Sequence, residues 1–149
     1  MPGYTVRREI RAPREVVFTV LTDHEGYTKL TPLHWTLERA GSPQRNGIGA
    51  VRAIRPSRRV PFAIREEVTE YDEPNRFAYK VISGAPVRSH VGMVILTETP
   101  TGTQVEYTMD AVPKVPLPTK VITAGLRGLI NLLLRGVSKE AEARAARAS

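Results

Sequence analysis

The sequence predicts an α+β protein in which one strongly curved antiparallel sheet of six or seven strands wraps around a long C-terminal helix. Two observations support this fold class. Apolar and polar side chains alternate with a period of two through most of residues 34–110, and short turn sequences interrupt the alternation. Residues 119–137 instead carry apolar side chains at helical spacing, and a helix with a wide apolar face needs a sheet to bury it.

The N-terminal part of the chain predicts one strand followed by two short helices. Residues 4–11 alternate loosely and form the first strand. The sequence Ala12-Pro13-Arg14-Glu15 then opens a helix, because a proline at the first helical position gives up no hydrogen bond. Asp23 can cap the second short helix, which Pro32 ends.

Six strands are expected after these helices, and the first strand can join them as a seventh. Turn residues such as Pro74-Asn75 separate them, and connections this short force neighbouring strands to run antiparallel. Gly49 and Gly92 lie inside strand patterns and suit the bends of a curved sheet. The six strands are expected over residues 34–40, 49–56, 60–72, 76–83, 88–99 and 103–112.

A connector with three prolines between residues 113 and 118 leads into the C-terminal helix. This helix is expected to run from about Thr119 to near the C-terminus, with its last ten residues extending into solvent. One apolar stripe lies along it, formed by Ile122, Leu126, Leu129, Leu133 and Val137.

The chain has 149 residues, 41% of them hydrophobic, which predicts a single globular domain over residues 1–149. It has no cysteine, which excludes disulfides, thiolate zinc sites and cysteine nucleophiles and fits a reducing cytoplasm. The N-terminal residues carry no secretory signal. Arg127 and Arg135 interrupt the most apolar stretch, residues 121–137, so a transmembrane span is not predicted.

Positive charge is concentrated in one segment of a chain whose net charge is +7. The segment from Arg39 to Arg65 contains seven arginines and no acidic residue, and an acidic run from Glu66 to Glu73 follows it. We interpret both segments as facing solvent, because arginines that alternate on strands point outward by default. The alternative is a basic patch that binds anionic lipid or another acidic partner.

Several short motifs follow one another in a recognisable order. Residues 10–18 (IRAPREVVF) lead from a strand into a helix, residues 46–49 (NGIG) form a glycine loop, and residues 67–77 (EVTEYDEPNRF) form a hairpin. Their order resembles that of the START/Bet v 1-like (SRPBCC) superfamily, of the polyketide cyclase/dehydrase and lipid-transport type. The resemblance implies a helix-grip fold with an internal cavity. Members include lipid carriers, ubiquinone-binding proteins and aromatase/cyclases, so it leaves the activity open.

Patterns typical of metal sites, cofactor sites and nucleophilic catalysis are missing from the sequence. The three histidines, His24, His34 and His90, form no HxxxH pair, so no metal is predicted. Gly47-x-Gly49 lacks the third glycine of a dinucleotide loop, so no cofactor is predicted, and no GxSxG nucleophile occurs. His24 lies in a charged turn and is expected to be solvated. His90 shares a strand face with apolar residues and could orient a polar ligand group.

The side chains that are expected to face the interior favour ligand binding over catalysis. Tyrosine and tryptophan combine aromatic surface with one polar group, which suits a mostly apolar ligand held by one or two polar contacts. The leading hypothesis is therefore a non-enzymatic binder or carrier of a small hydrophobic molecule such as a lipid, fatty acid, quinone or polyketide-like aromatic. The expected ligand-binding residues are Trp35, Phe62, Phe77, Tyr79, His90, Tyr107, Met109, Leu126, Leu129 and Ile130.

Two other functions stay open. A polyketide aromatase/cyclase or dehydratase needs little more than a shaped pocket with acid/base groups, for which His90, Tyr79, Tyr107 and an inward arginine are candidates. A protein that docks on anionic membranes would use the Arg39–Arg65 segment, and its binding would weaken steeply in salt. Direct nucleic-acid recognition is not predicted, because no aromatic side chains interleave with the arginines as a stacking platform.

Overall fold

The computed structural model describes residues 3–148, which form seven strands and three helices. The N-terminal elements are a strand and two short helices, as the sequence predicts. In chain order the elements are β1 (Gly3–Ile10), α1 (Arg14–Thr22), α2 (Tyr27–Leu30), β2 (His34–Arg39), β3 (Val51–Arg55), β4 (Ile64–Asp72), β5 (Arg76–Ser83), β6 (Val87–Thr99), β7 (Gly102–Pro113) and α3 (Thr119–Ala148).

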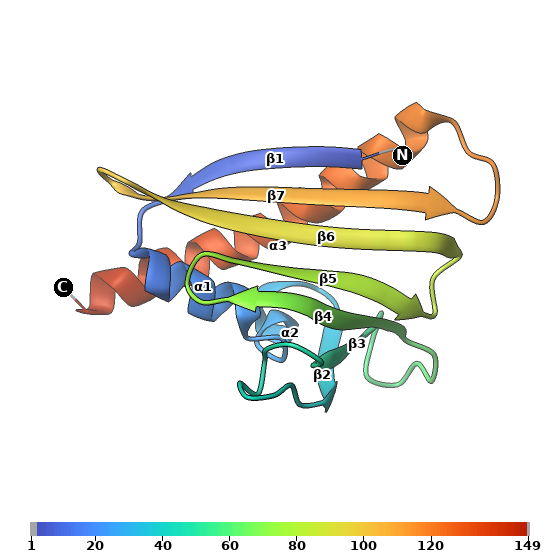
Figure 1. Cartoon of the computed structure of the whole chain (residues 1–149), viewed down its shortest axis with the longest axis horizontal. Coiled ribbons are helices and arrows are strands. Elements are labelled where there is room, and N and C mark those ends of the chain that lie inside the picture. Colours follow the sequence, from blue (N-terminus) through green and yellow to red (C-terminus); the bar gives the residue numbers. More distant parts are fainter. Residues whose placement is uncertain (1–2, 149) are drawn as a thin grey trace.

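All seven strands form one antiparallel sheet in the order β1-β7-β6-β5-β4-β3-β2. Strands β2 to β7 follow one another as a meander, and β1 adds beside β7 in a register that pairs Gly3 with Asp110 and Ile10 with Thr103. The sheet curves along the length of α3, and α1 and α2 pack against the same helix (Figure 1). This arrangement confirms the predicted helix-grip fold.

The core fills the space between the concave face of the sheet and α3. Alternation along the strands supplies one side of it, as in β7, where Val105, Tyr107 and Met109 are buried. The predicted stripe on α3 supplies the other side, and Leu133 and Val137 are buried on it. The helix differs from expectation near its end, because it stays regular to Ala148 and packs the fully buried Ala141 against the core.

The two halves of α3 differ in burial. The part from Thr119 to Gly128 is largely exposed, whereas the part from Ile130 to Ala141 supplies most of the buried side chains of the helix. By length and composition α3 is the one helix among residues 3–148 that could cross a membrane, and a third of its most apolar stretch is buried inside the protein. Such a helix is weak evidence for a span, because core helices of soluble proteins meet the same criteria.

One predicted strand begins later than expected. The alternation had suggested a strand over residues 60–72, but β4 begins at Ile64 and residues 60–63 form a loop. Pro61 explains the difference, because proline has no N–H to donate to a neighbouring strand. Phe62 therefore lies outside the sheet and its side chain is 67% exposed, so the prediction that it faces the interior is wrong.

Candidate functional site

A cavity of about 110 Å³ lies between the sheet and α3. It is nearer to the end of the sheet where β4 begins and β5 ends, because Ile64, Val81 and Ala85 line it. Most of its walls are apolar side chains from β2 to β5, from β7 and from α3, and β6 contributes His90. Five lining residues carry hydrogen-bonding groups: Arg52, Glu66, Tyr79, His90 and Trp35, whose indole N–H donates to Thr31.

A buried ion pair forms the polar part of the wall. Arg52 on β3 lies directly opposite Glu66 on β4, and its Nε and Nη2 atoms are 2.8 and 2.7 Å from Glu66 Oε1. The two side chains are only 2% and 8% exposed. The acidic run and the arginines of this region had been interpreted as facing solvent, and for Arg52 and Glu66 that interpretation is wrong.

Aromatic rings surround the Arg52 guanidinium. Its Cζ atom lies 4.4 Å from the ring centroid of Tyr79, 5.0 Å from that of Trp35 and 5.8 Å from that of Tyr27. A cation over an aromatic face is attracted to the ring's negative face, which compensates part of the lost hydration. Burial opposes the charge of Arg52, but Glu66 and the tyrosines outweigh it and keep the pKa of the guanidinium above its usual value.

His24 also forms a hydrogen bond with the Arg52 guanidinium. His24 Nδ1 lies 3.2 Å from Arg52 Nη1 and Nε2 lies 3.0 Å from the carbonyl oxygen of Asn46. Because arginine can only donate, Nδ1 accepts and Nε2–H donates, so the ring is neutral. His24 is fully buried, against the expectation that it is solvated, and burial, followed by the charge of Arg52, lowers its pKa to about 3.

Two tyrosine hydroxyls meet beside the guanidinium. The hydroxyl groups of Tyr79 on β5 and Tyr107 on β7 are 2.6 Å apart and both rings are buried. Burial raises the pKa of Tyr107 to about 12 and that of Tyr79 well above its usual value. Both phenols therefore stay protonated at neutral pH, where they can donate a hydrogen bond but are poor proton acceptors.

His90 is the polar lining residue that lacks a partner. Its Nε2 atom is buried and forms no hydrogen bond with any residue the structure describes. Burial, partly offset by the carboxylate of Glu66, lowers the pKa of His90, so its imidazole is uncharged at neutral pH. A buried polar atom without a partner costs about 1–3 kcal/mol, which a guest molecule or water in the cavity would recover.

The structure brings together half of the residues that the sequence singled out. Trp35, Tyr79, His90, Met109 and Leu129 line the cavity. The remaining inward-facing candidates are buried in the surrounding core: Phe77, Tyr107, Leu126 and Ile130.

Sequence reasoning missed the charged members of the site, although strand alternation contains a signal for them. Arg52 lies two residues before Ile54, and Glu66 lies two residues after Ile64. Side chains two residues apart share a face, so both charges belong to the apolar face of their strands. Ile54 pairs with Ile64 and Arg52 with Glu66 in the register of β3 and β4.

A larger hollow of about 550 Å³ lies at the surface between α2 and the C-terminal half of α3. Its lining carries both signs of charge, including Asp23, Lys29, Glu140 and Arg144. Glu140 and Arg144 already form an ion pair with each other. The smaller cavity is the better candidate for ligand binding, because its walls are apolar and it contains an unpartnered polar group.

Gly92 makes room for the Tyr79 ring. It lies opposite Tyr79 in the register of β5 and β6, and a Cβ at position 92 would overlap Cζ and the hydroxyl of Tyr79. We expect Gly92→Ala to lower the free energy of unfolding by about 1–3 kcal/mol, measured by urea denaturation, because the ring cannot move without leaving Arg52 and Tyr107.

Gly125 on the exposed part of α3 is the matched control for Gly92. A Cβ at position 125 meets no atom within 4 Å, so Gly125→Ala should leave stability unchanged or raise it by up to about 1 kcal/mol. Combining Gly92→Ala with Tyr79→Leu should cost less than the sum of the two single variants, since the smaller side chain relieves the overlap. Additive costs would show that Gly92 and Tyr79 are independent.

The fold and the cavity define the class of protein: a helix-grip domain with an internal cavity that has apolar walls and one polar wall. The chain belongs to the family described as polyketide cyclase / dehydrase and lipid transport, which it matches over residues 1–142. Binding of small hydrophobic ligands and polyketide cyclisation are the activities that this family and fold support in general. No curated protein matches the sequence.

Solved structures with the same fold have diverged far in sequence. The di-domain ARO/CYC protein StfQ of the steffimycin biosynthetic pathway is similar with a TM-score of 0.76 and 15% identity, over 97% of this chain and 52% of that one. The protein TTHA0849 from Thermus thermophilus is similar with a TM-score of 0.72 and 20% identity, over 97% of this chain and 99% of that one. Ara h 8.0201 is similar with a TM-score of 0.69 and 15% identity, over 97% of each chain. At these identities the likeness shows the fold alone.

Proposed function

We propose that the protein binds a compact, mostly apolar and uncharged molecule that carries one carbonyl or hydroxyl group. The observation that carries this proposal is the buried Nε2 atom of His90, which has no partner among the described residues and borders a cavity with apolar walls. A carbonyl or hydroxyl group at this atom would complete its hydrogen bond while the rest of the molecule contacts the apolar walls.

The charge balance of the cavity favours a neutral ligand. The charges of Arg52 and Glu66 cancel, and His90 and Tyr79 are uncharged at neutral pH. A carboxylate placed in the cavity would lie near Glu66 without a free cation to compensate it, and burying an unpaired charge is costly. Quinones and polyketide-like aromatics therefore fit the cavity better than fatty acids.

The size of the cavity favours a single ring. A volume of about 110 Å³ is close to the roughly 150 Å³ that is known to hold a benzene molecule in an apolar protein cavity. Pockets for larger ligands usually have volumes of about 300 Å³ or more. A larger ligand would require the part of α3 that carries Leu129 and Leu133 to move away from the sheet.

Three small probes of similar size test the proposal. In NMR titrations we expect acetophenone, which carries one carbonyl group, to bind at least about tenfold more tightly than ethylbenzene, which cannot hydrogen-bond, and than the anion benzoate. His90→Phe should abolish the preference over ethylbenzene, whereas Phe62→Ser, at an exposed position, should preserve it. Equal affinity for benzoate, or a preference that survives His90→Phe, would contradict the proposal.

A polyketide cyclase or dehydratase is the second candidate, and a neutral imidazole and a protonated phenol on the cavity wall support it. In the tautomer with its proton on Nδ1, Nε2 of His90 could accept a proton while the Tyr79 hydroxyl donates a hydrogen bond to the enolate oxygen that forms. Incubation with a poly-β-ketone thioester, followed by mass spectrometry for loss of water, would detect such turnover. Turnover that His90→Phe abolishes would favour the enzyme over the carrier.

A further inference from the structure

Ion pairs neutralise most of the arginines in the segment from Arg39 to Arg65. Five of the seven arginines between positions 39 and 65 form ion pairs with glutamates: Arg39, Arg45, Arg52, Arg55 and Arg65. Arg58 and Arg59 remain, and both are exposed on the loop between β3 and β4. Neither forms an ion pair with any residue between 3 and 148. Within the segment from Arg39 to Arg65, the unpaired positive charge is therefore confined to this loop.

Three loops meet at the end of the sheet that carries Arg58 and Arg59. They are the β3–β4 loop (56–63), the β5–β6 loop (84–86) and the β7–α3 connector (114–118), which alternating strand directions place at the same end (Figure 1). The N–H of Lys114 donates to the carbonyl of Pro86 over 3.0 Å. Gly84 packs so closely on the Ala63 carbonyl that a Cβ would overlap it. We call this surface, with the first turn of α3, the basic end.

Large apolar side chains are exposed at the basic end. Among residues 3–148, seven large hydrophobic side chains are exposed, and four of them belong to these loops or to the first turn of α3. Their exposed fractions are 67% for Phe62, 60% for Val115, 50% for Leu117 and 55% for Val121. A group of exposed apolar side chains of this kind marks an interaction surface.

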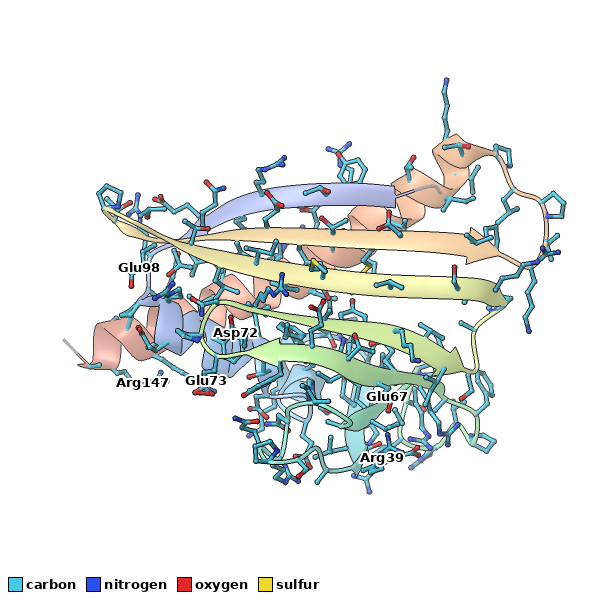
Figure 2. The ribbon with its side chains drawn as sticks, viewed as in Figure 1. Arg39, Glu67, Asp72, Glu73, Glu98 and Arg147 are labelled. Atoms are coloured by element: carbon cyan, nitrogen blue, oxygen red, sulfur yellow. The ribbon has the colours of Figure 1, made fainter. Side chains whose placement is uncertain are left out.

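The charges at the basic end are all positive. Five exposed cations lie on the three loops and on adjoining residues of β6 and α3, and none forms an ion pair with a residue the structure describes: Arg58, Arg59, Arg88, Lys114 and Lys120. The three loops contain no acidic residue. The acidic side chains Asp72, Glu73 and Glu98 lie at the opposite end of the sheet (Figure 2). That end carries both signs of charge, because Arg14 pairs with Glu98 and Arg147 lies there as well (Figure 2), whereas the three loops of the basic end carry positive charge alone.

We propose that the basic end docks on the surface of an anionic lipid membrane. Exposed apolar side chains among unpaired cations match a bilayer interface, where the apolar groups enter the headgroup region and the cations face lipid phosphates. A nucleic acid would be met by the cations alone and would leave Phe62 and Leu117 exposed. A second copy of the chain packed end to end would bring like charges together.

Docking in this orientation turns the cavity toward the membrane. Ile64, Val81 and Ala85 line the cavity and lie at the same end of the sheet as the docking loops. The exposed first part of α3, which borders the connector, would lie at the lipid surface as well. The docking proposal does not depend on the ligand, because membrane binding can be measured with an empty cavity.

Sedimentation with vesicles of stated composition tests the proposal. We expect the full-length protein to bind vesicles of phosphatidylcholine with about one third phosphatidylglycerol at least about tenfold more strongly than pure phosphatidylcholine vesicles, since each cation contributes about fivefold. The binding should fall at least about tenfold between about 0.1 M and 1 M salt, as the screening length falls from about 10 Å to about 3 Å. Salt-insensitive or absent binding would overturn the proposal.

Matched variants locate the surface. Arg58→Glu combined with Arg59→Glu should weaken binding at least about tenfold, and so should Phe62→Ser combined with Leu117→Ser. The control for the arginine pair is Arg8→Glu combined with Lys139→Glu, which changes the net charge by the same amount at exposed positions elsewhere. The control for the apolar pair is Ile48→Ser, because the Ile48 side chain is 51% exposed at the other end of the sheet. Equal losses in the controls would overturn the proposal. Two other results without vesicle binding would also overturn the proposal. One is binding of duplex DNA by the protein, and the other is a dimer that dissociates in the Phe62→Ser variant.

Discussion

Replacing Glu66 with alanine is expected to lower the free energy of unfolding by about 3–5 kcal/mol, measured by urea denaturation. The reason is the burial of its partner, because the Arg52 side chain is 2% exposed and cannot reach water when Glu66 is gone. The neighbouring His24 cannot replace the carboxylate, since its ring is neutral. The aromatic rings around the guanidinium offset only part of the loss.

Glu67 provides the matched control one residue further along β4. It pairs with Arg39 at the surface, where the two side chains are 28% and 59% exposed (Figure 2). Glu67→Ala should cost less than about 1 kcal/mol, because water and ions screen an exposed pair. Similar losses for Glu66→Ala and Glu67→Ala would show that Arg52 finds another partner or reaches solvent.

Removing both members of the buried pair should lower the free energy of unfolding much less than removing Glu66 alone. The double variant Arg52→Met with Glu66→Leu is expected to have a free energy of unfolding only about 1–3 kcal/mol below that of the wild-type protein. Apolar side chains of similar size often replace a buried ion pair without loss, and the remaining cost comes from Nδ1 of His24, which loses its donor. In the same variant the cavity would lose its polar wall. The preference for acetophenone over ethylbenzene should then fall, which separates the binding role of the pair from its effect on stability.

The fold was predictable because it depends on patterns repeated along the whole chain. The strand over residues 76–83 and the start of α3 at Thr119 match the predicted bounds, since alternation and the proline-rich connector mark them clearly. An error at one position, such as Phe62, does not change the order of the strands. The period of the apolar residues therefore determines the architecture even where single side chains are placed wrongly.

The candidate site was predictable only in its apolar part. Tyr79 and Met109 follow the alternation of their strands and line the cavity as expected. Arg52 and Glu66 look like surface residues in sequence, because Arg52 is one of seven arginines between positions 39 and 65 and Glu66 opens an acidic run. Alternation places each of them on the apolar face of its strand, but the register that sets them opposite each other depends on contacts between strands that no local pattern contains.

Lowering the pH from about 7 to about 5 is expected to remove about 2 kcal/mol of stability through His24 alone. Burial, followed by the charge of Arg52, lowers the pKa of His24 to about 3 in the folded protein, against about 6.5 in an unfolded chain. Between these two values the unfolded chain takes up a proton at His24 and the folded protein does not. The contribution is therefore complete above about pH 6.5 and is lost as the pH falls toward 3.

The variant His24→Gln isolates this effect. A glutamine amide can accept from Arg52 and donate to the Asn46 carbonyl as the imidazole does, but it does not titrate. Urea denaturation at several pH values should show a shallower dependence between about pH 5 and 7 for this variant than for the wild-type protein. His90, whose pKa burial also lowers, contributes equally to both proteins and cancels in the comparison. His34→Gln, at a half-buried position on β2, is the control, and a wild-type slope in His24→Gln would show that His24 does not stay neutral in the folded protein.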